Sequence, residues 1–166
     1  MMLYLVRHGI AVELDGYAVT RDEDRMLTPA GIKKIRAVAE GLKEMACAPA
    51  RIVSSPLVRA VETAELMAEI LAPRVAVETA ECLAGHVPAA DTLAWLRKQP
   101  AQDTMLVGHL PHIADMAGHL LCDCRTADVV FKKGAVCCFS IDGKVAAGHV
   151  QLEWLIQPAA LRRLGD

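Results

Sequence analysis

The sequence has almost no net charge and no long charged segment. Its 18 basic and 20 acidic residues give a formal net charge of -2, and neither sign forms a long run. Nucleic acids and anionic membranes attract basic patches, so we expect neither of them as a partner. Any anion that the protein binds must be held by a few local groups.

The beginning of the chain lacks a long apolar segment. Only a few apolar residues precede Arg7, no basic leader comes before them, and Glu13 and Asp15 follow soon afterwards. Neither a signal peptide nor a transmembrane helix fits this pattern. We therefore expect a cytoplasmic protein.

The chain contains cysteines but no CxxC motif. This absence argues against a zinc site and against a secreted disulfide framework, and most of the cysteines stand among apolar residues. We expect buried, reduced thiols, no metal and no cofactor, although Cys122 and Cys124 leave a redox or metal role open. The six cysteines are Cys47, Cys82, Cys122, Cys124, Cys137 and Cys138.

Repeats, low-complexity tracts and long linkers are also missing. The 166 residues are 54% hydrophobic, which predicts one domain over residues 1–166 with a sizeable core. Strand-like and helix-like segments alternate up to about residue 121, which predicts a three-layer α/β fold with a mostly parallel central sheet flanked by helices. The expected strands are Met2–Val6, Arg51–Val53, Val75–Val77, Thr104–Val107, Ala135–Ile141 and His149–Trp154. The last two, joined through Asp142 and Gly143, predict a C-terminal antiparallel hairpin.

Two helices have clear starts in the sequence. The first begins with Thr28 as N-cap and Pro29 after it, and the second with Ser55 as N-cap and Pro56 after it. Helical spacing predicts two buried faces, Ile32, Ile35, Ala39, Leu42 and Ala46 on the first helix and Leu57, Val61, Ala64, Ala68 and Leu71 on the second. Arg59 lies off the second face in this prediction. Further helices are expected from Pro111 to about Leu121 and around Ala89–Arg97.

Polar residues follow three of the expected strands at the point where each strand ends. The three segments are Arg7-His8-Gly9, Ser54-Ser55-Pro56 with Arg59, and Gly108-His109-Leu110-Pro111. Because parallel strands end at one edge of a sheet, two arginines and two histidines should converge there. Helix N-termini at the same edge favour an anion. A cation such as Arg59 is unfavourable in a first helical turn, so its position hints at a bound anion.

The chemistry that suits this cluster is phosphoryl transfer. The planar guanidinium groups of Arg7 and Arg59 match phosphate oxygens and keep their charge at any working pH. A neutral imidazole is a nucleophile near pH 7 without activation by a strong base. His8, which is held at the strand end beside Gly9, is the best candidate for that role.

With these residues the sequence resembles the histidine phosphatase superfamily, which has a phosphoglycerate mutase-like fold and an RHG motif near the N-terminus. The resemblance extends in order to "LTPAG", "VSSPLVRAVETA" and "VGHLP". It implies that His8 is the phosphorylated nucleophile and that Arg7 and Arg59 bind the phosphoryl group. By the same resemblance, His109 is the second histidine, which stabilises the transferring group.

Within the superfamily, the chain departs from the mutase pattern. Ile10 and Leu14 occupy places where mutases carry an acidic or amide residue and an Asn, and the segment between Arg59 and His109 is too short for the mutases' helical insertion. The sequence is most similar to SixA-type phosphohistidine phosphatases, which implies a phosphohistidine-bearing partner protein as substrate. A broad phosphomonoesterase for small metabolites and a catalytically silent phosphate-binding module are the alternatives.

Further polar residues are weaker candidates. Glu81 precedes "CLAGH", about where family members carry a general acid, but it also fits a solvated surface residue. Gly9 and Ser55 are candidate substrate-binding residues. Ser54 and Ser55 are typical of helix caps, yet a hydroxyl there could reach phosphate.

The remaining histidines allow more than one interpretation. His112 either lines the pocket or caps a helix, and His86 fits a loop at the pocket rim. We expect His119 and His149 to be structural or exposed.

Overall fold

The computed structural model describes residues 1–14, 16, 17, 19–122, 129–143, 145, 146 and 150–165. The centre of the fold is a six-stranded sheet. Its strands are β1 (Met2–Arg7), β2 (Arg51–Ser54), β3 (Val77–Thr79), β4 (Thr104–Gly108), β5 (Val136–Ser140) and β6 (Gln151–Ile156). The order across the sheet is β3-β2-β4-β1-β5-β6, with the first four strands parallel. β5 runs antiparallel to both β1 and β6. The predicted α/β fold and its C-terminal antiparallel strand pair are confirmed.

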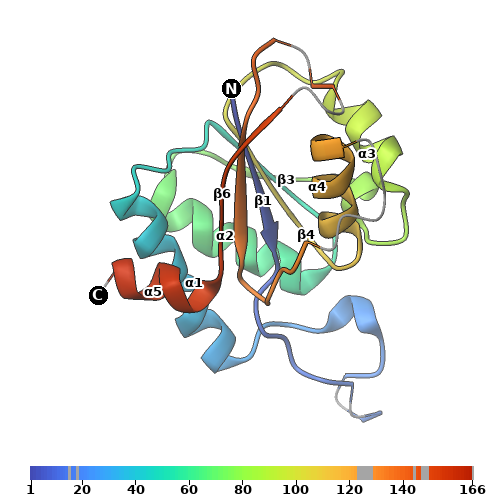
Figure 1. The fold of residues 1–166 in the computed structure, drawn as a ribbon. Coiled ribbons are helices and arrows are strands. Elements are labelled where there is room, and N and C mark those ends of the chain that lie inside the picture. The colour runs from blue at the N-terminus through green and yellow to red at the C-terminus, as the bar shows by residue number, and fades with distance from the viewer. Residues whose placement is uncertain (15, 18, 123–128, 144, 147–149, 166) are drawn as a thin grey trace.

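Helices cover both faces of the sheet. They are α1 (Pro29–Glu44), α2 (Val58–Leu71), α3 (Ala89–Leu96), α4 (His112–Cys122) and α5 (Pro158–Leu164), with short 3-10 helices η1 (Asp22–Asp24) and η2 (Glu81–Leu83). The helices α1, α2 and α5 lie on one face, and α3 and α4 lie on the other (Figure 1). Alternation along β1 explains the two cores, because Tyr4 packs with the first group and Leu3 and Leu5 pack with the second.

The central position of β1 determines where the polar residues lie. β1 pairs with β4 on one side and with β5 on the other, and its register sets Arg7 opposite Gly108. β2 pairs in turn with β4, where Ser54 lies opposite Val107. The carboxyl ends of β1, β2 and β4 therefore meet at one edge of the sheet.

The start of α1 matches the prediction, but part of its expected buried face does not. Thr28 is the N-cap, and its hydroxyl oxygen accepts the Gly31 N–H at 2.9 Å. The helix buries Ile35, Val38, Ala39 and Leu42. Ile32 is 37% exposed, and Ala46 lies exposed beyond the helix end with a φ of 57°. Both were wrongly placed in the core, because the buried stripe starts at Gly31 and leaves out Ile32, and the helix ends at Glu44.

The predictions for α2 need two corrections. Its N-cap is Leu57 and not Ser55, because the Ser55 N–H still donates to Val107 of β4. The expected core residues Leu57 and Val61 are only half-buried. Arg59 is on the buried face and 6% exposed, so its placement off that face was wrong. The buried face is thus turned towards Arg59, and it consists of Arg59, Ala60, Thr63, Ala64, Met67, Ala68 and Leu71.

Smaller differences concern the edges of the fold. β3 and β6 each begin two residues later than predicted, and α5, η1 and η2 were not predicted. α5 packs backbone to backbone on α1, since a Cβ at Gly41 would overlap the Leu161 carbonyl. In the described part of the chain, no helix is both long and apolar enough to cross a membrane.

The cysteines match the prediction only in part. Cys47, Cys137 and Cys138 are buried and free, whereas Cys82 is half-buried and Cys122 is exposed at the end of α4. Cys124 and His149 lie outside the described residues. Over the ranges that the structure describes, no three His, Cys, Asp or Glu side chains gather closely enough to hold a metal ion.

Candidate active site

The two arginines and two histidines lie together at the sheet edge. His8 follows β1, Arg59 lies in the first turn of α2, and His109 follows β4. The ring centroids of His8 and His109 are 4.9 Å apart, and the charges of Arg7 and Arg59 act on both rings. His8 and His109 are only 7% and 5% exposed, and Arg7 is half-buried. The convergence expected from the strand ends is thus present in the structure.

His8 presents an unprotonated nitrogen. Its Nδ1–H donates to the carbonyl oxygen of Gly9 at 2.7 Å, and because a carbonyl can only accept, Nε2 keeps a lone pair. Burial above all, and then the nearby His109, lowers the pKa of His8 from 6.5 to about 3, with Arg59 and Arg7 adding to the effect. The ring is therefore neutral near pH 7, and Nε2 can act as a nucleophile.

His109 carries its ring hydrogen on the same nitrogen as His8, but its hydrogen-bond partner lies at the other ring nitrogen. Its Nε2 lies 2.8 Å from the Ser55 hydroxyl oxygen, which also accepts the Leu57 N–H. We assign the hydroxyl hydrogen to this contact, so that Ser55 donates to Nε2 and the ring hydrogen lies on Nδ1. Burial and the charge of Arg59 lower the pKa of His109 to about 4, so this ring is also neutral. Its Nδ1–H is then a donor without a positive charge on the ring.

Three buried donors at this edge lack a hydrogen-bond partner. In the part of the chain that the structure describes, the buried side-chain nitrogens without a partner are Arg7 Nε, Arg59 Nε, His109 Nδ1 and His112 Nδ1. Leaving a buried donor unpaired costs roughly 1–3 kcal/mol, so each one calls for an explanation. Arg7, Arg59 and His109 together form a donor set that a tetrahedral oxyanion would satisfy.

The outer ends of both guanidinium groups are anchored to the protein. Arg7 Nη1 donates to the carbonyl of Phe131 at 2.6 Å. Arg59 Nη1 and Nη2 donate to the backbone carbonyl and the carboxylate of Asp22, at 2.7 Å and 2.8 Å. Because these ends are held, the two Nε–H groups have fixed positions.

The comparisons with known proteins identify the family of the chain. The model of the histidine phosphatase superfamily (branch 1) matches residues 3–87, about half of the chain. The chain belongs to this superfamily. Arg7, His8 and Arg59 lie within the matched segment, and His109 lies beyond it.

Relatives of this superfamily member include an uncharacterized protein of Picosynechococcus sp. strain PCC 7002. The two are 37% identical over 121 residues, which cover 70% of this chain and 71% of the other. The solved structure of the protein histidine phosphatase SixA complexed with tungstate superposes with a TM-score of 0.81 at 23% identity, over 97% of this chain and 99% of that one. The α-ribazole phosphatase of Shigella flexneri gives a TM-score of 0.74 at 16% identity, over 93% and 96%. At these identities the two structures show a shared fold.

Asp22 belongs to the candidate site through its contacts with Arg59, although the sequence did not predict it there. It lies on η1 and also accepts from Arg25 Nη1 at 3.0 Å. Partial burial acts to raise the pKa of Asp22, but the hydrogen bonds from Arg25 and Arg59 outweigh it, so the pKa is lowered. Asp22 stands in the acidic run Asp22–Asp24, which has no periodicity that points to a buried partner.

Thr63 was missed as well. Its hydroxyl oxygen accepts the Gly9 N–H at 3.0 Å, and its hydrogen goes to the Arg59 carbonyl at 2.6 Å. One side chain thus joins the loop of the nucleophile to the helix of the arginine. The signal was in the sequence, because Thr63 stands four residues after Arg59 within "VSSPLVRAVETA". Gly9 is needed beside it, since a Cβ there would lie 2.7 Å from Ile35 Cγ1.

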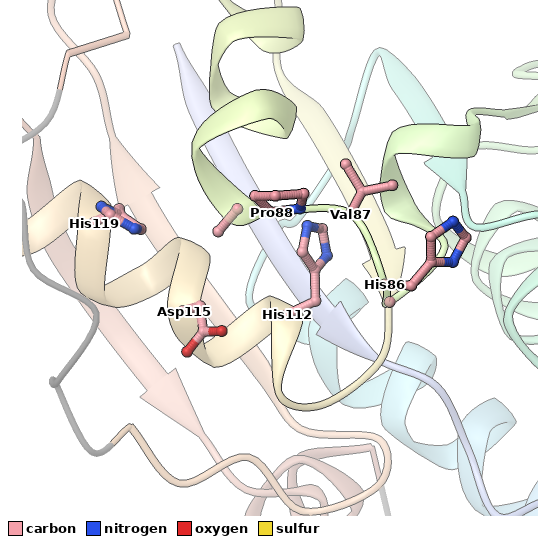
Figure 2. A pocket seen from close by; sticks show the side chains of 8 residues that line it. His86, Val87, Pro88, His112, Asp115 and His119 are labelled. Carbon is pink, nitrogen blue, oxygen red and sulfur yellow. The ribbon is translucent and has the colours of Figure 1, made fainter.

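The weaker candidates lie in different places. Glu81 is exposed on η2, next to β4, and its role as a general acid stays a prediction. Ser54 donates to the Ser55 carbonyl at 2.8 Å, and Ser55 contacts His109. His86 is exposed and lines a pocket together with the buried His112, which is the first residue of α4 (Figure 2).

Proposed function

We propose that this histidine phosphatase transfers a phosphoryl group to His8 Nε2 and then to water, and that its substrate is phosphohistidine on a partner protein. The observation that carries the proposal is the set of three unpaired buried donors next to a neutral histidine. A binding site for phosphate would not need the lone pair on His8. A catalytically silent module is therefore the weaker explanation.

The side chains divide the work of the first step. Arg7 Nε, Arg59 Nε and His109 Nδ1 donate to the phosphoryl oxygens, and the two guanidinium charges offset the charge that develops there. The lone pair of His8 Nε2 forms a bond to phosphorus while the bond to the leaving group breaks. The positive charge on the phosphorylated ring is stabilised through Nδ1–H, which already donates to the Gly9 carbonyl.

Hydrolysis reverses the roles. Water attacks phosphorus, and the electron pair of the P–N bond returns to Nε2. Both protons of the water remain on oxygen atoms of the released phosphate. His8 becomes neutral again, in agreement with its pKa of about 3. No step needs a cofactor, because the arginines supply the positive charge.

The leaving group favours phosphohistidine over an ester. An ester leaves as an alkoxide, which needs a well-placed general acid, whereas phosphohistidine leaves as an imidazole. The one candidate acid, Glu81, is exposed, and between the end of α2 and the start of β4, which the structure describes throughout, the only α-helix is the eight-residue α3. The fold shared with SixA supports the same substrate class. The position of Glu81 in η2 beside β4 is the observation that favours the alternative, a phosphomonoesterase for small metabolites.

Trapping the phosphorylated intermediate tests the mechanism. Wild type and His8→Ala are mixed with a phosphohistidine protein or with p-nitrophenyl phosphate and quenched within milliseconds. We expect an acid-labile, base-stable phosphoenzyme in the wild type and none in His8→Ala, with circular dichroism to show that the variant is folded. Full turnover by His8→Ala contradicts the mechanism.

The same two substrates distinguish the two activities. We expect a higher kcat/KM for the phosphohistidine protein, and Glu81→Gln should slow the ester more than phosphohistidine. If the ester is preferred and phosphohistidine stays intact, the metabolite phosphatase is the correct activity.

A further inference from the structure

A second polar pocket adjoins the candidate active site. Its volume is about 220 Å³, and its walls include His86, Pro88 and three residues of α4 that Figure 2 shows along one side of that helix, His112, Asp115 and His119. Gly85 also lines the pocket, and a Cβ at Gly85 would lie 3.6 Å from His109 Cβ. The pocket therefore shares a wall with the second histidine of the site.

The protonation of His112 follows from its neighbours. The Thr92 hydroxyl donates its single hydrogen to the Cys82 carbonyl at 2.6 Å, so at 2.9 Å it must accept from His112 Nε2. Nε2 thus carries the ring hydrogen, and Nδ1 keeps a lone pair. Burial lowers the pKa of His112, which keeps the ring neutral. His112 is 2% exposed, and in the described part of the chain Nδ1 has no hydrogen-bond partner.

An unpaired buried acceptor is satisfied by a ligand that brings a hydrogen-bond donor. Resting on the function proposed above, we propose that this pocket holds the leaving imidazole of the phosphohistidine substrate, with His112 Nδ1 accepting the N–H of the ring nitrogen that is not bonded to phosphorus. The three unpaired donors at His8 then bind the phosphoryl group. The fourth unpaired nitrogen, an acceptor, binds the group that departs.

The chemistry of the leaving group needs this hydrogen. If the second ring nitrogen is protonated, the electron pair of the breaking P–N bond returns to the ring, and a neutral imidazole departs. Without that hydrogen the ring would depart as an imidazolate anion, which is a much poorer leaving group. His8 forms the new P–N bond in the same step, so charge and atoms balance. An acceptor that selects the protonated ring therefore selects the reactive form of the substrate.

The size and charge of the pocket agree with this ligand. Pockets for drug-sized ligands measure roughly 300–1,000 Å³, so a smaller pocket suits one side chain. Val87 and Pro88 give it an apolar wall, against which a flat ring can pack (Figure 2). The Asp115 carboxylate acts on His112 and also favours the cationic ring of protonated phosphohistidine.

Two substitutions of His112 test the roles of its two ring nitrogens separately. In His112→Asn the amide oxygen replaces the Nδ1 acceptor and the bond to Thr92 is lost, whereas His112→Gln keeps a donor for Thr92 and loses the acceptor. We expect His112→Gln to lower kcat/KM for a phosphohistidine protein about tenfold, and His112→Asn to keep it within about threefold. The kcat/KM for p-nitrophenyl phosphate and the inhibition constant of inorganic phosphate should change less than twofold in both variants.

Imidazole itself provides a second measurement. Competitive inhibition of p-nitrophenyl phosphate hydrolysis by imidazole should weaken about tenfold in His112→Gln and little in His112→Asn, with thermal unfolding as the folding control. Equal effects of both variants on phosphohistidine and imidazole would overturn the proposal and leave His112 as a packing residue. If the wild type forms no phosphoenzyme with either substrate, the proposed function fails first and this inference with it.

Discussion

Two kinds of segment contribute to the candidate site, and they differ in how firmly they are held. His8 and His109 follow β1 and β4, Arg59 lies in the first turn of α2, and each is less than a tenth exposed. Asp22 and Glu81 come from the 3-10 helices η1 and η2, and both are largely exposed, with 52% of the Asp22 side chain accessible. The hydrogen-bonded register of the sheet fixes the strand ends that carry His8 and His109, and the buried face of α2 fixes Arg59, whereas the second group has only short local turns.

The buried group contains the residues that would contact the reacting phosphoryl group, and the exposed group contains residues that would only modify its surroundings. Phosphoryl transfer depends on donors held in fixed positions around the transition state, and strand ends and the first turn of a packed helix provide such positions. Exposed loop residues act on the orientation and the electrostatic environment of those donors. Their contributions to the free energy are smaller, because solvent screens their charges. Substitutions in the two groups should therefore differ in size, and the following experiments test that expectation.

The largest effect is expected for Arg59→Lys. Lysine keeps the charge but cannot donate to two Asp22 oxygens and present an N–H to phosphate at the same time. We expect kcat/KM to fall by about 10²–10³, as for the loss of an oxyanion donor. Arg36→Lys, at an exposed arginine paired with Glu69, is the matched control. A loss of less than tenfold would mean that charge alone matters at Arg59.

Thr63→Val should have an intermediate effect. Valine keeps the shape of the side chain but removes the bridge between the Gly9 N–H and the Arg59 carbonyl. We expect kcat to fall about tenfold and stability to fall by about 1–3 kcal/mol, measured by steady-state kinetics and urea unfolding. Thr63→Ser keeps the hydroxyl and should restore most of the activity. If serine and valine behave alike, the hydroxyl does not position the site.

The buried histidines should make the fold sensitive to acid. The folded-state pKa values of His8 and His109 are about 3 and about 4, and in the unfolded chain they are about 6.5. Between these values the unfolded chain binds more protons, so stability falls as the pH decreases from about 6.5 to 4. The slope is up to about 1.4 kcal/mol per histidine and pH unit. Thermal unfolding from pH 7.5 to 4.5 should show a steeper loss in wild type than in a His8→Asn, His109→Asn double variant.

Asp22→Asn should slightly strengthen the binding of phosphate, whereas the substitutions above weaken the activity. The amide oxygen can still accept from Arg59, and the backbone carbonyl bond is unchanged, but a negative charge beside the phosphate site is lost. We expect inorganic phosphate to inhibit about two- to fivefold more strongly, with less difference at high salt. Weaker inhibition would show instead that the charge of Asp22 is needed to hold Arg59.

The smallest effect is expected from a chelator. Two arginines already supply the positive charge that a divalent ion would give. Activity after EDTA treatment should stay within experimental error of the untreated protein. Loss of turnover with EDTA and recovery with added Mg²⁺ or Zn²⁺ would contradict the proposed mechanism.

The same comparison explains what the sequence could predict. The Thr28 cap depends on a local pattern and is confirmed, and the ends of β1, β2 and β4 lie within one residue of the prediction. The burial of Arg59 was not predictable from helical periodicity, because its partner Asp22 lies 37 residues away on a segment without a pattern. The misplaced N-cap of α2 has a similar origin, since Ser55 is held by β4 rather than by the helix. Long-range pairings of this kind appear only when the chain is folded.

The double pairing of β1 also limits how the nucleophile can move. A strand with neighbours on both sides and interior residues at most 5% exposed belongs to the part of a protein whose amides exchange with solvent only on global unfolding. His8 is attached directly to that strand and cannot reach outward. Under the proposed function, a phosphorylated side chain would have to travel to His8, so the partner would have to display it on a protruding and accessible segment.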